Sequence, residues 1–280
     1  MFDLTGRNAV VTGASAGLGR EMALALAGQG ANVAILARRE NKLEEVAAEI
    51  RALGVDCLVV KCDVTINAQV EAAAAKCIAH FGKVDILVNN AGGGHQIDAA
   101  EGDLDDWLSI ADLNLNSVYR CCRAFGKHMI DNGYGRIINI ASMYGLVGSR
   151  GTKNSPYAAA KGGVVNLTRA LGSEWARYGV NVNAVSPGYF RTEATEGMWE
   201  LVNQIASDNT PIKRGGRQGE ITAPVCFLAS DEASYMVGAV IPCDGGYWVE
   251  GENGVRVFRT DGSQVYFSGG ERLMGRSGEL

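Results

Sequence analysis

The feature that most limits how this chain can fold is a glycine turn between an apolar strand and an apolar helix. Residues 8–12 predict a short buried strand, and residues 18–27 predict a helix. Gly13, Gly17 and Gly19 lie at the junction in the spacing GxxxGxG. Gly13 permits a tight turn, Gly17 lets the backbone approach a pyrophosphate, and the start of the helix offers N–H groups. In this strand–helix context the turn predicts a dinucleotide-binding site.

Short apolar segments and amphipathic segments alternate along most of the chain. Strands are predicted over residues 8–12, 33–37, 57–62, 84–88, 136–140, 180–185 and 239–243. Helices are predicted over residues 18–27, 43–53, 70–81, 104–130 and 155–178. Strands with few polar residues that alternate with helices indicate a parallel sheet covered on both faces. We therefore expect an α/β fold: a single doubly wound Rossmann-type domain over residues 1–248, with a parallel seven-stranded sheet.

Composition and charge argue against several classes of protein. The 280 residues include 26 basic and 31 acidic side chains, a net charge of −5, which argues against a nucleic-acid partner. No apolar run approaches the ~18 residues of a spanning helix, and the amino terminus has no hydrophobic signal region, so no membrane partner is expected. The seven cysteines lack CxxC spacing, so we expect a reduced, cytoplasmic protein without a metal site.

A tyrosine and a lysine four residues apart form the candidate catalytic pair. Tyr157 and Lys161 lie in a predicted helix, where residues at this spacing project from one face. A free tyrosine loses its proton near pH ~10, and a lysine cation close by lowers that pKa. The pair would therefore donate and accept a proton, although the same spacing also occurs on ordinary solvated helix faces.

Other motifs accompany this pair in a fixed order. They are, along the chain, Asn89-Asn90-Ala91-Gly92, Asn114, Ser142 and Pro187-Gly188. Together with the glycine turn, they resemble the short-chain dehydrogenase/reductase family over roughly residues 1–248. The resemblance implies a nicotinamide-dependent enzyme that interconverts a secondary alcohol and a ketone, assembled as a homotetramer or homodimer.

The resemblance also implies a role for each of four catalytic residues. Tyr157 would be the general acid in reduction and the base in oxidation. Lys161 would lower the pKa of Tyr157 and hold the ribose of the nicotinamide. Ser142 would hydrogen-bond the substrate oxygen, and Asn114 would anchor a water in a proton relay to Lys161.

The end of the second predicted strand favours NADP(H) over NAD(H). An acidic residue there would bind the ribose 2′-hydroxyl and repel a 2′-phosphate, but the sequence has Ala37-Arg38-Arg39. A guanidinium can bind that phosphate, whereas Ala16 stands where some NADPH-dependent relatives have a second base, and Arg39 could be simply solvated. The expected cofactor residues are Gly13, Ser15, Gly17, Leu18, Gly19, Arg38, Asp63, Val64, Asn90, Gly92, Tyr157, Lys161, Pro187, Gly188 and Thr192.

Segments around the catalytic pair indicate the substrate only by resemblance. Residues 143–148 and 162–168 look most like gluconate 5-dehydrogenases; the alternatives are a 3-oxoacyl thioester reductase and a catalytically idle nucleotide-binding regulatory protein. Residues 187–219 are expected to form helices over the site as a mobile lid. His95 and four loop residues are expected either to contact a polar substrate or to be solvated. Those four are Arg150, Thr152, Lys153 and Asn154.

Residues 249–280 form an extension beyond the predicted domain. Two strand-like runs flank Asp261-Gly262, a pair typical of two-residue β-hairpin turns. The expected cross-strand pairs are Phe258 with Val265 and Val257 with Tyr266. A lone hairpin is marginal in water, so we expect this one to pack at a subunit interface, the alternative being a disordered tail.

Overall fold

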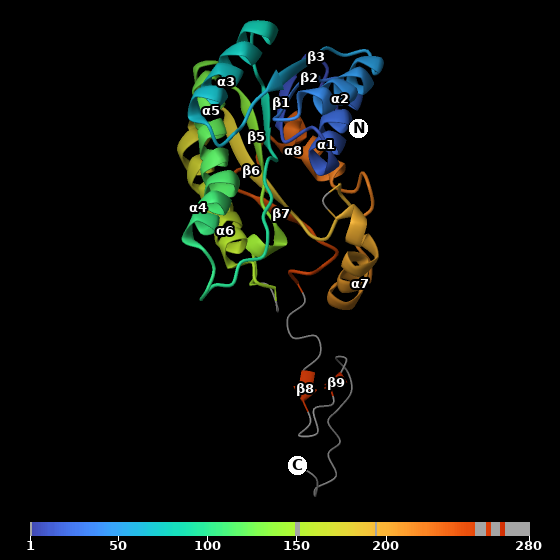
Figure 1. Ribbon diagram of the computed structural model, residues 1–280. Helices are drawn as coiled ribbons and strands as arrows, with labels where there is room; N and C mark the ends of the chain where they lie inside the picture. The colour runs from blue at the N-terminus through green and yellow to red at the C-terminus, as the bar shows by residue number, and fades with distance from the viewer. Residues whose placement is uncertain (1, 149–151, 194, 250–255, 259–263, 267–280) are drawn as a thin grey trace, which may run out of the picture.

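Seven parallel strands form one sheet at the centre of the protein (Figure 1). The computed structural model describes residues 2–148, 152–193, 195–249, 256–258 and 264–266. The strand order is β3-β2-β1-β4-β5-β6-β7, which confirms the predicted doubly wound sheet. The strands are β1 (Asn8–Thr12), β2 (Asn32–Ala37), β3 (Cys57–Lys61), β4 (Ile86–Asn89), β5 (Gly135–Ile140), β6 (Val180–Pro187) and β7 (Val240–Cys243).

Helices cover both faces of this sheet (Figure 1). They are α1 (Gly17–Gly28), α2 (Glu40–Ala52), α3 (Asn67–Phe81), α4 (Leu104–Ala111), α5 (Ser117–Asp131), α6 (Ser155–Trp175), α7 (Trp199–Asn209) and α8 (Thr222–Ala229). The side chain of Val11 packs in the core that contains α1, α2 and α8. Its neighbour Val10 packs in the opposite core, with α3, α5 and α6. Both faces of the strands are therefore buried, which explains their nearly unbroken apolar sequence.

Helix α8 is an element that the periodicity did not predict. The segment Thr222–Ala229 is apolar on all sides, and Val225, Cys226 and Leu228 are buried. A helix without a polar face lacks the 3.6-residue alternation by which a surface helix is recognised. By sequence alone such a short apolar run could equally be a buried strand; in the structure it is a helix that packs against α1 and β5.

The long helix predicted over residues 104–130 is interrupted in the structure. Helix α4 runs into a π-helical turn at Asp112–Asn116, and α5 continues from Ser117. In residues 187–219 the expected helices are present as a 3₁₀ turn at Glu196–Met198 and as α7. π-Turns inside helices frequently occur at functional sites, and this one contains Asn114.

The extension contains the predicted antiparallel hairpin, but in a different register. Strands β8 (Arg256–Phe258) and β9 (Gln264–Tyr266) pair so that Val257 faces Val265 and Phe258 faces Gln264. The predicted pairing of Phe258 with Val265 is therefore wrong by one residue, because the pairing is centred on Asp261 and not between Asp261 and Gly262. The turn and the rest of the extension lie outside the described residues, so the predicted interface remains a prediction.

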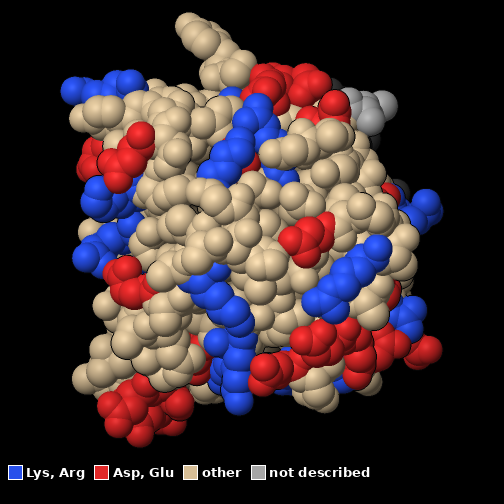
Figure 2. Space-filling view, turned by 90° about the horizontal axis from the view of Figure 1, so that it is seen from above, with Lys and Arg blue, Asp and Glu red and all other residues tan. Residues whose placement is uncertain are grey.

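Charged side chains of both signs are interspersed on the face seen in Figure 2, and neither sign gathers into one broad patch there. This pattern follows from the nearly equal numbers of acidic and basic residues in the chain. Within the described ranges, no helix is both long and apolar enough to cross a bilayer.

Candidate active site

The candidate active site lies at the carboxyl ends of the central strands. The strand order reverses between β1 and β4, and ligands of open α/β sheets bind at such a switch point. A cavity of about 470 Å³ opens there. The predicted residues that line it are Gly13, Gly17, Leu18, Gly19, Asn90, Gly92, Ser142, Tyr157, Lys161, Pro187, Gly188 and Thr192. A neighbouring pocket of about 250 Å³ is lined by Ser15, Arg38, Asp63 and Val64.

The glycine turn has the backbone that its sequence predicts. Gly13 and Gly17 have φ values of +67° and +54°, a conformation that residues with a β-carbon rarely adopt. A β-carbon on Gly19 would lie 2.3 Å from the carbonyl oxygen of Gly13, so only glycine fits there. Helix α1 begins at Gly17 after Ala16, and no described side chain caps its first N–H groups. The pyrophosphate expected at these N–H groups stays a prediction.

Asn90 and Thr12 fasten this turn to the end of β4. The Asn90 side chain donates to the carbonyl oxygens of Thr12 at 2.9 Å and Gly13 at 3.2 Å. The Thr12 hydroxyl in turn accepts from the backbone N–H groups of Asn90 and Ala91, both at 3.0 Å. Asn90 therefore shapes the floor of the cavity by tying two strand ends together. Sequence reasoning missed Thr12, because its partners lie about eighty residues away in the chain.

Ser142, Tyr157 and Lys161 meet at the inner end of the cavity. Ser142 follows β5 and hydrogen-bonds Tyr157, which lies in the first turn of α6. The Lys161 ammonium donates to the carbonyl oxygen of Ile140 at 2.8 Å and lies 5.6 Å from the centre of the Tyr157 ring. Gly92 lies beside this group, where a β-carbon would approach Lys161 Nζ to 3.3 Å. The two helix positions thus share one face, as the spacing predicted.

The protonation of this pair differs from the expectation. Burial raises the pKa of Tyr157 above its ordinary value, and the hydrogen bond with Ser142 opposes this only in part. Burial also lowers the pKa of Lys161 to about 8. In the protein alone, burial therefore dominates the pKa of Tyr157, and the Lys161 ammonium donates to the Ile140 carbonyl. The prediction that Lys161 lowers the pKa of Tyr157 in the working enzyme stays a prediction.

Asn114 is held by the π-turn below the cavity. Its amide nitrogen donates to the carbonyl oxygens of Gly93 at 2.6 Å and Ile110 at 2.9 Å, and its amide oxygen accepts from the Gly93 N–H at 3.0 Å. The side chain is fully buried. A β-carbon on Gly92 would lie 2.8 Å from the Asn114 oxygen, so the loop after β4 packs directly on this amide. Asn114 therefore positions the loop that borders the catalytic group.

The pocket lined by Ser15, Arg38 and Asp63 borders an ion pair that the sequence did not indicate. We call this pocket the nucleotide end of the groove that it forms with the cavity. Arg39 donates to both carboxylate oxygens of Glu193, at 3.0 and 2.7 Å, and to the Ser15 hydroxyl at 3.2 Å. Arg39 is therefore not simply solvated. The Asp63 carboxylate accepts from the N–H and hydroxyl of Thr65, at 3.0 and 2.7 Å, which fixes its orientation at the edge of the pocket.

Two tyrosines at the cavity wall and a third beside them form a cluster. The hydroxyls of Tyr144 and Tyr189 lie 3.0 Å apart, and both residues line the cavity. The ring of Tyr247 meets their two rings edge to face, at centroid distances of 6.1 and 5.9 Å. Sequence reasoning missed this cluster, although Tyr144 lies two residues after Ser142 and Tyr189 directly follows Pro187-Gly188.

The polar loop residues considered as substrate readers have other partners. Lys153 forms an ion pair with Asp98 at 2.6 Å, and this ion pair lowers the pKa of Asp98 to about 2. His95 lies 3.4 Å from Asp106 and is largely exposed. Arg150 lies outside the described residues. The structure therefore gives no support to Lys153 or His95 as substrate contacts.

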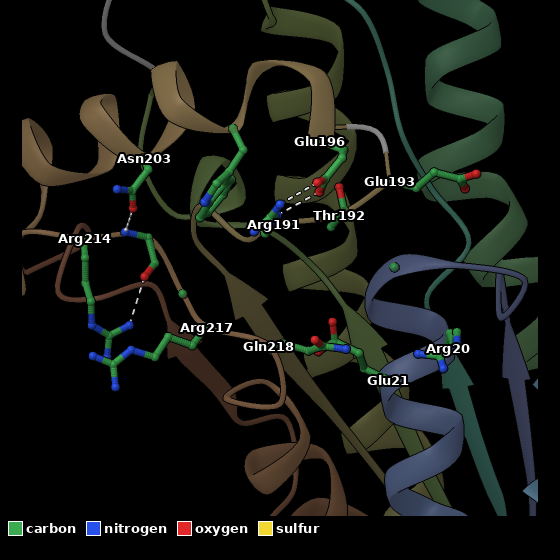
Figure 3. Close-up of a pocket in the computed structure, with 14 residues that line it drawn as sticks. Arg20, Glu21, Arg191, Thr192, Glu193, Glu196, Asn203, Arg214, Arg217 and Gln218 are labelled. Atoms are coloured by element: carbon green, nitrogen blue, oxygen red, sulfur yellow. Dashed lines mark hydrogen bonds and ion pairs between the residues drawn. The ribbon is translucent and has the colours of Figure 1, made fainter. Parts of the chain in front are cut away.

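A larger hollow of about 630 Å³ lies between α1 and the segment that carries α7 (Figure 3). Several arginines line it, and three of them form ion pairs with carboxylates. Arg191 faces Glu196 within one loop. Arg214 donates to both oxygens of Glu220 at 2.8 Å. These paired guanidiniums do not create a strong anion site.

A doubly wound sheet, a glycine turn at its switch point and a Ser-Tyr-Lys group beside it define an oxidoreductase on a nucleotide-binding fold. Residues 13–248 match the family described as enoyl-(acyl carrier protein) reductase. The chain belongs to the short-chain dehydrogenase/reductase family, as its motifs indicated, and is an enzyme that acts on alcohol or ketone substrates.

Relatives in this family act on different substrates. Galactitol 2-dehydrogenase (L-tagatose-forming) of Cereibacter sphaeroides is 41% identical over 89% of this chain and 98% of its own. A 3-oxoacyl-(acyl-carrier-protein) reductase of Staphylococcus aureus is 36% identical over 87% of this chain and 98% of its own. The structure of a protein from Beutenbergia cavernae described as a putative NAD(P)-dependent gluconate 5-dehydrogenase, with NADP at low occupancy, has a TM-score of 0.83 and 39% identity, covering 89% and 99% of the two chains.

Proposed function

We propose that this protein is an NADP(H)-dependent oxidoreductase that interconverts a secondary alcohol and a ketone on a polyhydroxylated substrate, such as a sugar acid. The observation that carries the proposal is the meeting of Ser142, Tyr157 and Lys161 in one cavity with the glycine turn. A hydroxyl and a phenol aimed at one oxygen can stabilise charge that develops there and supply its proton.

The residues around the groove fit a nicotinamide dinucleotide. The uncapped start of α1 would hold its pyrophosphate, while Asp63 and Val64 would border the adenine. Pro187, Gly188 and Thr192 would border the nicotinamide, which supplies or accepts the hydride when bound. A β-carbon on Gly188 would lie 2.7 Å from the Asp244 backbone, so this loop too is packed closely enough to require glycine.

Each catalytic side chain has a defined task in this proposal. Tyr157, whose raised pKa keeps its hydroxyl protonated, gives its proton to the substrate oxygen in reduction. Ser142, which hydrogen-bonds Tyr157, would donate a hydrogen bond to the same substrate oxygen. Lys161, with a pKa of about 8, can exchange a proton near neutral pH and would bind the ribose hydroxyls. Asn114 holds the loop in place and would anchor a water that connects Lys161 to solvent.

The preference for NADP(H) rests on the end of β2. Arg38 lines the nucleotide pocket, and the two residues directly after the strand are arginines and not the acidic residue that would repel a 2′-phosphate. The relative from Beutenbergia cavernae with bound NADP supports this choice.

The substrate class rests on the paired hydroxyls of Tyr144 and Tyr189. Phenols at a cavity wall favour a substrate with hydroxyl groups over an apolar acyl chain. Relatives named for galactitol and gluconate support this class. The alternative is a 3-oxoacyl thioester reductase, which the relative from Staphylococcus aureus favours.

The test is a panel assay that follows nicotinamide absorbance with sugar acids, polyols, ketoacids and acyl thioesters. We expect a kcat/KM at least ~10-fold higher for a polyhydroxylated substrate than for an acyl thioester. A preference for the thioester would select the alternative. Nucleotide binding without turnover of any substrate in the panel would instead indicate a catalytically idle regulatory protein.

A further inference from the structure

One ion pair connects the nucleotide end of the groove to the segment that carries α7. Arg39 lies between β2 and α2, whereas Glu193 lies between β6 and α7. Arg39 donates to both oxygens of the Glu193 carboxylate, which is the two-pronged geometry that a guanidinium also forms with phosphate. The same guanidinium donates to Ser15, inside the pocket expected to hold the 2′-end of the cofactor.

The orientation of Glu193 differs from that of the other acidic side chain on its loop. Glu196 faces Arg191, and the two residues form a pair within the loop (Figure 3). Glu193 points away from that pair, and its partner Arg39 belongs to a different part of the fold. Glu193 is therefore the loop carboxylate that reaches the nucleotide pocket.

We infer that Glu193 is a cofactor-specificity residue, because its carboxylate competes with the 2′-phosphate of NADP(H) for the Arg39 guanidinium. A phosphate bound by Arg39 would stand beside the carboxylate, and like charges repel, so binding the phosphate requires the ion pair to open. NAD(H) has no phosphate there and leaves the pair intact. This inference rests on the proposed use of a nicotinamide dinucleotide. It implies that Glu193 weakens the binding of NADP(H) relative to NAD(H).

The exposure of the pair sets the size of the effect. The Arg39 and Glu193 side chains are 47% and 57% exposed. Exposed ion pairs contribute little, so removing the competing carboxylate should change phosphate affinity by about 2- to 5-fold.

The test compares two ligands that differ only in the 2′-phosphate: adenosine 2′,5′-bisphosphate and adenosine 5′-monophosphate. Their dissociation constants are measured by titration calorimetry, which requires no turnover. In Glu193→Gln the bisphosphate should bind about 2- to 5-fold more tightly while the monophosphate is unchanged. The matched control is Glu196→Gln, which removes the same charge from the same loop but from the Arg191 pair, and should leave the affinity ratio unchanged.

The outcomes separate this inference from the proposed cofactor preference. An unchanged ratio in a folded Glu193→Gln protein, or an equal change in Glu196→Gln, would overturn the role of Glu193. Tighter binding of the monophosphate by the wild-type protein would refute the NADP(H) preference instead. In that case the inference about Glu193 is still tested by whether the ratio of bisphosphate to monophosphate dissociation constants differs between the variant and the wild-type protein.

Discussion

Replacing Lys161 by methionine should stabilise the fold while it abolishes activity. Burial lowers the pKa of Lys161 from 10.5 to about 8, and its side chain is only 3% exposed. Each unit of pKa shift corresponds to about 1.4 kcal/mol, so holding the charged form in the interior costs about 3 kcal/mol. The lost hydrogen bond to the Ile140 carbonyl offsets about 1 to 2 kcal/mol of that gain. Lys161→Met should therefore raise the free energy of unfolding by about 1 to 2 kcal/mol at pH 7.

The pH dependence of that gain follows from the two pKa values. Below pH 8 the lysine is protonated in both the folded and unfolded states, so the folded protein bears the full burial cost. Between pH 8 and 10.5 the unfolded state binds more protons, and wild-type stability rises with pH relative to the variant. Urea unfolding of both proteins at a series of pH values up to the alkaline range measures the difference. A variant that is less stable at pH 7, or a difference that does not shrink at alkaline pH, would refute the reasoning.

Three further predictions concern the reaction, the cofactor and the extension. Tyr157→Phe should reduce turnover by at least ~100-fold with nucleotide binding largely kept, because the transferable proton is lost; near-wild-type turnover in steady-state kinetics would contradict its role. Arg38→Asp should shift the ratio of kcat/KM values from NADP(H) toward NAD(H), because the carboxylate repels the 2′-phosphate; a wild-type protein that already prefers NAD(H) would make the prediction wrong. Truncation after Val249 should lower the assembly state seen by light scattering and the melting temperature, because the hairpin is proposed to pack between subunits; no change in either would exclude an assembly role.

Local sequence patterns were sufficient to predict most of the fold. The apolar strands and the glycine turn are each specified within a few residues, because both faces of the sheet are buried and the turn needs φ values above zero. Helix α8 escaped prediction because its sequence is apolar on every side and so has no polar face. The hairpin was found from Asp261-Gly262, but its register was not, since cross-strand pairing depends on the whole turn.

The sequence by itself determined the order of the elements, the glycine turn and the placing of Tyr157 and Lys161 on one helix face, because these depend on neighbours within a few residues. Only the tertiary structure decided the protonation of that pair, since desolvation depends on everything packed around it. Tertiary contacts also decided that Arg39 binds Glu193, a partner 154 residues away, and that Tyr247 packs on the two tyrosines of the cavity wall. Contacts between distant segments cannot be predicted from the spacing of neighbouring residues, because they form only when the strand ends are brought to one edge of the sheet.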